Sequence, residues 1–242
     1  MMNQSTNDAL GNEVEAMKYC VSHRTSYRYS QAVAFCKNQL RMQPISGGNV
    51  ICESSKVTIS PEPTYQDEYR DYFGNRVLAF SIESMHTQLV VEATSELEIR
   101  HNGMEKSSPS PSWESLLEGA IGETPEPPID QHRYRSPRIE PSTTFADYAA
   151  ISFQPQRPIL AASLDLIKRI HADFRYDVNA TTVGTTTDRA FALRAGVCQD
   201  FAHVAIACLR SLGLASRYVS GYLRTVPPPG KARLVGADES HA

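Results

Sequence analysis

The sequence predicts an α+β protein in which an N-terminal antiparallel β-sandwich-like domain precedes an α/β core. Residues 17–102 contain short runs rich in β-branched and aromatic residues, separated by turn residues and without helical periodicity. Residues 158–213 instead place apolar side chains at helical spacing. Between these patterns, residues 103–141 are rich in proline, which lacks a backbone donor and breaks regular structure. The change of pattern predicts a domain boundary near residue 103.

The β half is predicted from four segments that read as strands. The third segment indicates a hairpin, because Gly74 and Asn75 can supply the positive φ angles of a tight turn. The fourth alternates apolar and polar residues, as a half-buried strand does. The segments are KYCVSHRTSYRYS, SKVTIS, EYRDYFGNRVLAFSIE and QLVVEATSELEIR. Short strands with turn signals favour an antiparallel sandwich or barrel.

The domain organisation follows from these patterns. Residues 1–16 are polar and are predicted to be a disordered extension, with no features of an export signal. Residues 17–102 form the predicted β domain, and 103–141 form a proline-rich linker with at most one short helix, in WESLLEGAI. Residues 142–242 form the predicted core domain.

The composition limits which partners and which cellular location are expected. With 24 basic and 27 acidic side chains, the formal net charge is −3, which favours neither a nucleic-acid partner nor an anionic membrane surface. No apolar run approaches the roughly 20 residues that span a bilayer. Five cysteines at irregular spacings, without an export signal, predict reduced thiols in the cytoplasm. The oligomeric state stays open.

Three helices are predicted in the second half. The segment PILAASLDLIKRIHADF begins with Pro158 at a first helical turn and places four apolar side chains on one face. These side chains are Leu160, Leu164, Ile167 and Phe174. In TTTDRAFALRAG, Thr187 or Asp188 can cap the start of a short helix and Gly196 its end.

The strongest helical pattern begins at Cys198 and is stopped by Gly213. Its predicted apolar stripe consists of Phe201, Val204, Ala205, Cys208, Leu209 and Leu212. At a helix start, unpaired N–H groups and the positive end of the helix dipole favour a thiolate, which is the nucleophilic form of cysteine. The backbone N–H of Cys198 could also stabilise an oxyanion. From position alone, a buried structural cysteine is equally compatible.

The sequence assigns no catalytic role to the other cysteines and argues against a metal site. Cys208 lies in the apolar stripe and is expected in the core, and Cys20, Cys36 and Cys52 are expected to be structural. The pattern C-x4-H-x4-C formed with His203 resembles part of a zinc site. On a continuous helix, however, successive five-residue steps rotate by about 140°, so the side chains would not converge. The sequence therefore predicts no metal and no cofactor.

A nucleophilic cysteine needs a base, and His241 in GADESHA is the most direct candidate because it ends a small polar stretch after a strand-like run. The segment GVCQDFAHVAIACLRSLGLASRYVSGYL, with GADESHA downstream, resembles the transglutaminase-like superfamily, above all its bacterial cysteine-protease-like branch. TSYRYSQAV, ISPEP, DYFGNRVLAF and MHTQLVVEATSELE resemble that branch's N-terminal domain, and FRYD resembles its F-x-Y element. The resemblance covers roughly residues 18–242.

The resemblance implies a papain-like or transglutaminase-like α/β core and thioester chemistry on a peptide or carboxamide. Cys198 would be the nucleophile and His241 the base, while Gln199 and Tyr176 would contact the oxyanion or the substrate. It implies no nucleic-acid or membrane partner.

The sequence departs from the family at its end. The family's base is followed by tryptophan and then by an orienting aspartate, whereas here one residue follows His241. Asp238, Glu239 and Asp200 are weak substitutes, so the core is expected to be C-terminally incomplete and a weak catalyst. The alternatives are a non-catalytic peptide-binding module and a thiol redox protein, the latter disfavoured by the absence of C-x-x-C.

Overall fold

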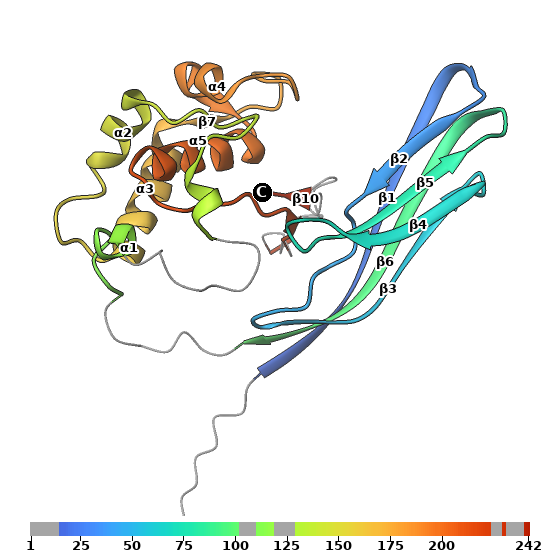
Figure 1. Ribbon diagram of the computed structural model, residues 1–242, viewed down its shortest axis with the longest axis horizontal. Helices are drawn as coiled ribbons and strands as arrows, with labels where there is room; N and C mark the ends of the chain where they lie inside the picture. The colour runs from blue at the N-terminus through green and yellow to red at the C-terminus, as the bar shows by residue number, and fades with distance from the viewer. Residues whose placement is uncertain (1–14, 102–109, 119–128, 224–228, 231–239) are drawn as a thin grey trace, which may run out of the picture. The chain divides into compact units, whose positions relative to one another are not determined.

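The computed structural model describes residues 15–101, 110–118, 129–223, 229–230 and 240–242. The chain divides into two compact units, Met1–Ser107 and Ser108–Ala242, which are drawn in Figure 1. Of the predicted N-terminal extension, residues 1–14 lie outside the described residues. None of the helices in the described part of the chain has the length and apolar character that a bilayer-spanning segment requires.

The first unit is built from two antiparallel three-stranded sheets. One has the order β1 (Glu15–Val33), β6 (His86–His101), β3 (Val50–Ser60), and the other has β2 (Cys36–Leu40), β5 (Arg76–Ile82), β4 (Tyr65–Arg70). Phe80 and Ile82 of β5 pack with Leu89 and Val91 of β6, so the two sheets share one hydrophobic core. The predicted antiparallel sandwich is confirmed (Figure 1).

The β4–β5 hairpin turns around the carboxylate of Asp71. This carboxylate accepts the backbone N–H groups of Phe73 and Asn75, each at 3.0 Å, and the Nε–H of Arg41 at 2.8 Å. Arg41 first, and then Asn75, hold the pKa of Asp71 at about 2. Gly74 has φ = 79°, as the predicted turn requires, whereas Asn75 does not have a positive φ.

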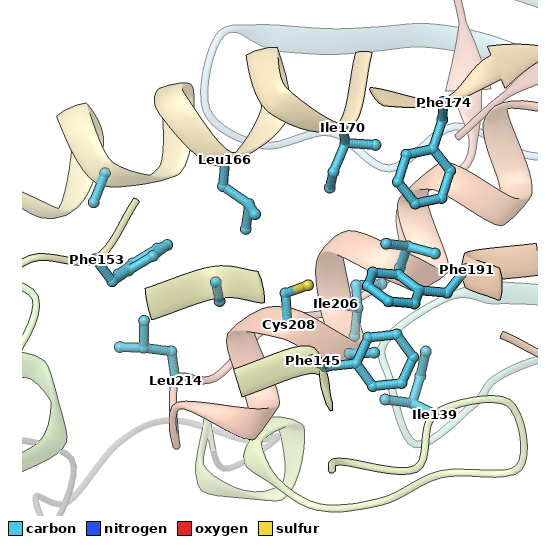
Figure 2. Packing of buried hydrophobic residues seen from close by; sticks show 14 residues of the cluster. Ile139, Phe145, Phe153, Leu166, Ile170, Phe174, Phe191, Ile206, Cys208 and Leu214 are labelled. Atoms are coloured by element: carbon cyan, nitrogen blue, oxygen red, sulfur yellow. The ribbon is translucent and has the colours of Figure 1, made fainter. Parts of the chain in front are cut away.

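The second unit surrounds α5 (Cys198–Ser211), which packs against α2 (Thr143–Ala150), α3 (Ile159–Asp173) and α4 (Thr187–Leu193). Its remaining elements are α1 (Ser115–Glu118), the 3-10 helix η1 (Ile129–Arg133), β7 (Arg175–Tyr176), β8 (Ala195–Gly196), β9 (Gly221–Tyr222) and β10 (Ser240–His241). Figure 2 shows Cys208 of α5 in the hydrophobic core with Leu166, Ile170 and Phe191. The predicted core position of Cys208 is confirmed by its complete burial.

Part of the segment predicted as a linker packs into this unit. Ile139 is buried in the core, and Trp113 packs against it with its ring edge-on to Phe153 at 5.8 Å between centroids. Pattern-breaking prolines stop regular structure here, but they do not prevent single apolar side chains from being buried.

A buried arginine holds the same segment to α5. Arg210 donates from Nη1 to the carbonyl of Tyr134 at 2.7 Å and to Oγ of Ser136 at 3.2 Å. Its Nε and Nη2 donate to the carbonyl of Ser216 at 3.1 and 2.7 Å. One guanidinium therefore joins the helix, the segment before α2 and the segment after α5.

The apolar face of α3 differs from the predicted one. Leu160, Leu164 and Ile167 are exposed, at 54%, 47% and 56%, whereas the buried stripe is Ala162, Leu166 and Ile170. The helix carries two apolar stripes at helical spacing, and the one that includes small Ala162 faces the core. Of the predicted face, Phe174 alone is buried.

The caps of α4 also differ from the prediction. Thr186, not Thr187 or Asp188, accepts the first-turn N–H of Arg189, because Thr186 is the extended residue just before the helix, with φ = −76° and ψ = 157°. The Thr187 hydroxyl donates to the carbonyl of Arg138 instead. The helix ends at Arg194, not at Gly196. Arg194 is left-handed with φ = 50°, and its guanidinium lies over the Phe191 ring at 3.9 Å, a cation–π contact that offsets the backbone strain.

Candidate active site

Cys198 is the first residue of α5, as predicted. Val197 precedes it with extended backbone angles, φ = −113° and ψ = 178°, and accepts the N–H groups of Asp200 and Phe201. A first-turn residue has a backbone N–H with no partner inside the helix. The Cys198 thiol is free, and the residue is only partly buried.

Asp200 lies in the first turn of the same helix and is buried, with 5% of its surface exposed. One oxygen, Oδ2, accepts the backbone N–H of Val197 at 2.9 Å and the hydroxyl of Thr181 at 2.7 Å. Gly196 comes so close that a Cβ built on it would lie 2.5 Å from the same oxygen. The carboxylate is therefore enclosed by the turn that leads into Cys198.

His203 and Tyr218 lie beside this helix start. Their rings stack with centroids 5.1 Å apart and planes inclined by 32°. Burial, and secondly Arg138, lower the pKa of His203 against the opposing charge of Asp200. Burial, and secondly the Cys198 thiolate, raise the pKa of the Tyr218 phenol. Tyr218 therefore lies within electrostatic range of the thiol and stays protonated, as a hydrogen-bond donor, at neutral pH.

His241 lies on β10, which pairs with β9 and places it opposite Gly221. Its Nε2 is buried and has no hydrogen-bond partner among the described residues. No hydrogen bond joins the His241 ring to Cys198 in the described part of the chain. The structure thus holds the predicted base on β10, paired with the strand β9 that follows Tyr218, without a hydrogen bond to the predicted nucleophile among the described residues.

The other predicted site residues flank Cys198. Tyr176 of β7 pairs in parallel with Gly196 of β8, is 61% exposed, and meets the ring of Phe201 at 6.4 Å. Gln199 follows Cys198 and is partly buried. Asp238 and Glu239 lie outside the described residues.

Sequence patterns had not singled out Thr181, Tyr218 or Arg138. Thr181 belongs to a polar run, NATTVGTTT, that carries no periodicity. The available signal was Asp200 itself, since an acidic residue in the first turn commonly accepts the N–H of the residue before the helix. The Val197 side chain has no acceptor atom, so the sequence showed no N-cap residue with which Asp200 would be expected to pair.

Within the described residues, no three His, Cys, Asp or Glu side chains gather where they could hold a metal ion. The chemistry available at Cys198 is that of a thiol at a helix start, with the Tyr218 phenol and the His203 imidazole beside the helix.

Comparisons with known proteins identify the family and the fold. The family model of the bacterial transglutaminase-like N-terminal region matches residues 19–98, and that of the transglutaminase-like superfamily matches residues 149–242. Uncharacterized proteins of Mycobacterium bovis and Mycobacterium tuberculosis are 37% identical over 230 residues, covering 93% of this chain and 72% of theirs. An uncharacterized protein of Mycobacterium leprae is 29% identical over 216 residues, covering 89% of this chain and 73% of its own.

A solved structure from Cytophaga hutchinsonii, described as "a Putative Cysteine Protease", superposes with a TM-score of 0.68 at 18% identity. It covers 94% of this chain and 71% of that one, and shows the same fold. The chain belongs to the transglutaminase-like superfamily. Within it, the β unit is the bacterial transglutaminase-like N-terminal region.

Proposed function

We propose that this protein is a thiol acyl-transfer enzyme acting on a peptide or protein carboxamide. His241 takes the proton of the Cys198 thiol and becomes an imidazolium, and the resulting thiolate attacks the carbonyl carbon and forms a carbon–sulfur bond. The carbon–nitrogen bond then breaks, and the leaving amine takes a proton from the imidazolium of His241. Water or a second amine resolves the thioester, returning the thiol and giving hydrolysis or transamidation.

One observation carries the proposal: in a transglutaminase-like core, Cys198 is placed at the first turn of the central helix α5. There its backbone N–H can donate to the oxyanion that forms on attack. The remaining cysteines lack this placement, since Cys208 is fully buried in the middle of α5 and three lie in the β unit. All five are free thiols, which supports a reducing, cytoplasmic location.

The test is acyl-enzyme trapping. The chain is mixed with a glutamine-containing peptide or an activated peptide ester, quenched in acid and mapped by mass spectrometry. An acyl adduct on Cys198, absent from Cys198→Ser and accumulating more slowly in His241→Gln, supports the proposal. Adduct formation that persists in Cys198→Ser, or no adduct in the parent chain, would refute it.

A second function, a peptide-binding module without turnover, is favoured by one observation. Nε2 of His241 is buried without a partner among the described residues, so no described group fixes the orientation of this ring. Under this alternative, peptide binds with equal affinity to the parent chain and to Cys198→Ser, as calorimetry would measure, and no acyl adduct forms.

A further inference from the structure

The carboxylate of Asp200 is buried without a basic partner among the described ion pairs. It accepts two hydrogen bonds on one oxygen, from Val197 N–H at 2.9 Å and from Thr181 Oγ1 at 2.7 Å. His203 does not neutralise it, because burial lowers the pKa of that imidazole and leaves it uncharged at neutral pH. Burying an unpaired carboxylate is costly, so its two donors and the helix start must hold it in place.

These contacts fix the backbone on both sides of the nucleophile. Upstream, the carbonyl of Gly196 accepts the N–H of Asp177, the residue that follows β7, at 2.9 Å. Val197, next in the chain, gives its N–H to Asp200. Cys198 therefore lies between a tied residue before it and the buried carboxylate two residues after it.

Thr181 extends this arrangement to a second segment. It lies in the loop between β7 and α4, which makes its own turn through the Thr182 N–H bond to Thr185 Oγ1 at 2.9 Å. Its hydroxyl is the point at which this loop is hydrogen-bonded to the carboxylate of α5. Removing that hydroxyl would leave Asp200 with only the Val197 N–H and free the carboxylate to rotate.

We propose that Asp200 and Thr181 are positioning residues that orient the Cys198 backbone N–H toward the substrate oxyanion. This inference rests on the proposed acyl-transfer function. Acylation needs both the thiol and the oriented N–H, whereas alkylation by iodoacetamide develops no oxyanion and needs only the thiol. Loss of the Thr181 hydroxyl should therefore slow acylation and spare alkylation.

The test compares Thr181→Val with Thr182→Val, a matched control one residue away whose hydroxyl makes only a 3.5 Å contact to Thr185. In single-turnover acylation by an activated peptide ester, Thr181→Val should be about tenfold slower, since small misplacements of a catalytic group cost one to two orders of magnitude. Its alkylation rate should stay within about twofold of the parent. Thr181→Ser, which keeps the hydroxyl, should restore acylation.

Equal acylation by the two valine variants would overturn the proposal, and so would a parallel loss of acylation and alkylation, which indicates general disruption of the helix start. If the parent chain itself forms no acyl adduct, the proposed function fails. The positioning role of Thr181 is then tested separately, by amide hydrogen exchange. Faster exchange at Val197 in Thr181→Val than in Thr182→Val would then support the positioning role, and equal exchange would refute it.

Discussion

Replacing Gly196 with alanine should destabilise the second unit by about 3 kcal/mol. The added Cβ would lie 2.5 Å from Oδ2 of Asp200 and 2.9 Å from its Cβ and Cγ, where ordinary contact begins at 3.4 Å. The carboxylate must therefore retreat by about 0.9 Å. Such a shift breaks hydrogen bonds that now measure 2.7 and 2.9 Å. Overpacking costs about 1–3 kcal/mol. A hydrogen bond to a charged group contributes about 1.5–3 kcal/mol to stability, and water that bonds to the displaced carboxylate restores part of this loss.

Urea unfolding followed by tryptophan fluorescence measures this effect. Trp113 is the single tryptophan and packs against the core of the second unit, so its emission reports on that unit. With a slope of about 2 kcal/mol per molar urea, the midpoint should fall by about 1.5 M. Gly184→Ala is the matched control, because its added Cβ meets its nearest neighbour, Thr182 Oγ1, at 3.8 Å. If the two midpoints agree within about 0.3 M, the steric reasoning at Gly196 is wrong.

In limiting iodoacetamide, Cys198 should be alkylated faster than Cys208, whose burial raises its pKa to about 12; peptide mass mapping checks the order, and the reverse order contradicts the assignment of the nucleophile. Because burial lowers the pKa of His203, its stabilising effect is complete above the unfolded value of about 6.5 and declines as pH falls below it. His203→Phe should lose less unfolding free energy than the parent between pH 7 and pH 5 in urea titrations, and an equal loss would count against this. The pKa of Asp71 is about 2, so its stabilisation is present above the unfolded value of 3.8 and is lost as pH falls through 2. Asp71→Asn should accelerate hydrogen exchange in the β4–β5 hairpin at pH 7, and unchanged protection would refute the role of this turn.

The sequence was sufficient for the fold class, since alternating and helical patterns each depend on local spacing. The helix that starts at Cys198 was predicted for that reason, and the β4–β5 hairpin was predicted from its turn residues Gly74 and Asn75. Periodicity, however, identifies a face without saying which neighbour covers it. In α3 both stripes satisfy the spacing, and packing against α5 selected the one containing Ala162 and Leu166 over the one containing Leu160.

The position of Cys198 at a helix start could be predicted because a glycine, a cysteine and the start of an apolar pattern stand together in the sequence. Its surroundings could not be predicted in the same way. Thr181 is hydrogen-bonded to Asp200, 19 residues away in the sequence, and the ring of Tyr218 stacks on His203 beyond the end of α5. Neither contact produces a periodic pattern in the sequence. Arg194 likewise ends α4 in a left-handed conformation that its position beside three aromatic rings makes tolerable.

The guanidinium of Arg210 bears on how natural variation in this chain should be interpreted. Its donors diverge in one plane to carbonyls of Tyr134 and Ser216, on segments that lie on either side of α5 in the sequence. A lysine ammonium keeps the positive charge but concentrates its donors at one atom and cannot span both acceptors. An arginine-to-lysine exchange, which substitution tables score as mild, is therefore a severe change at this position. A homologue carrying it would need a compensating donor near residue 134 or 216.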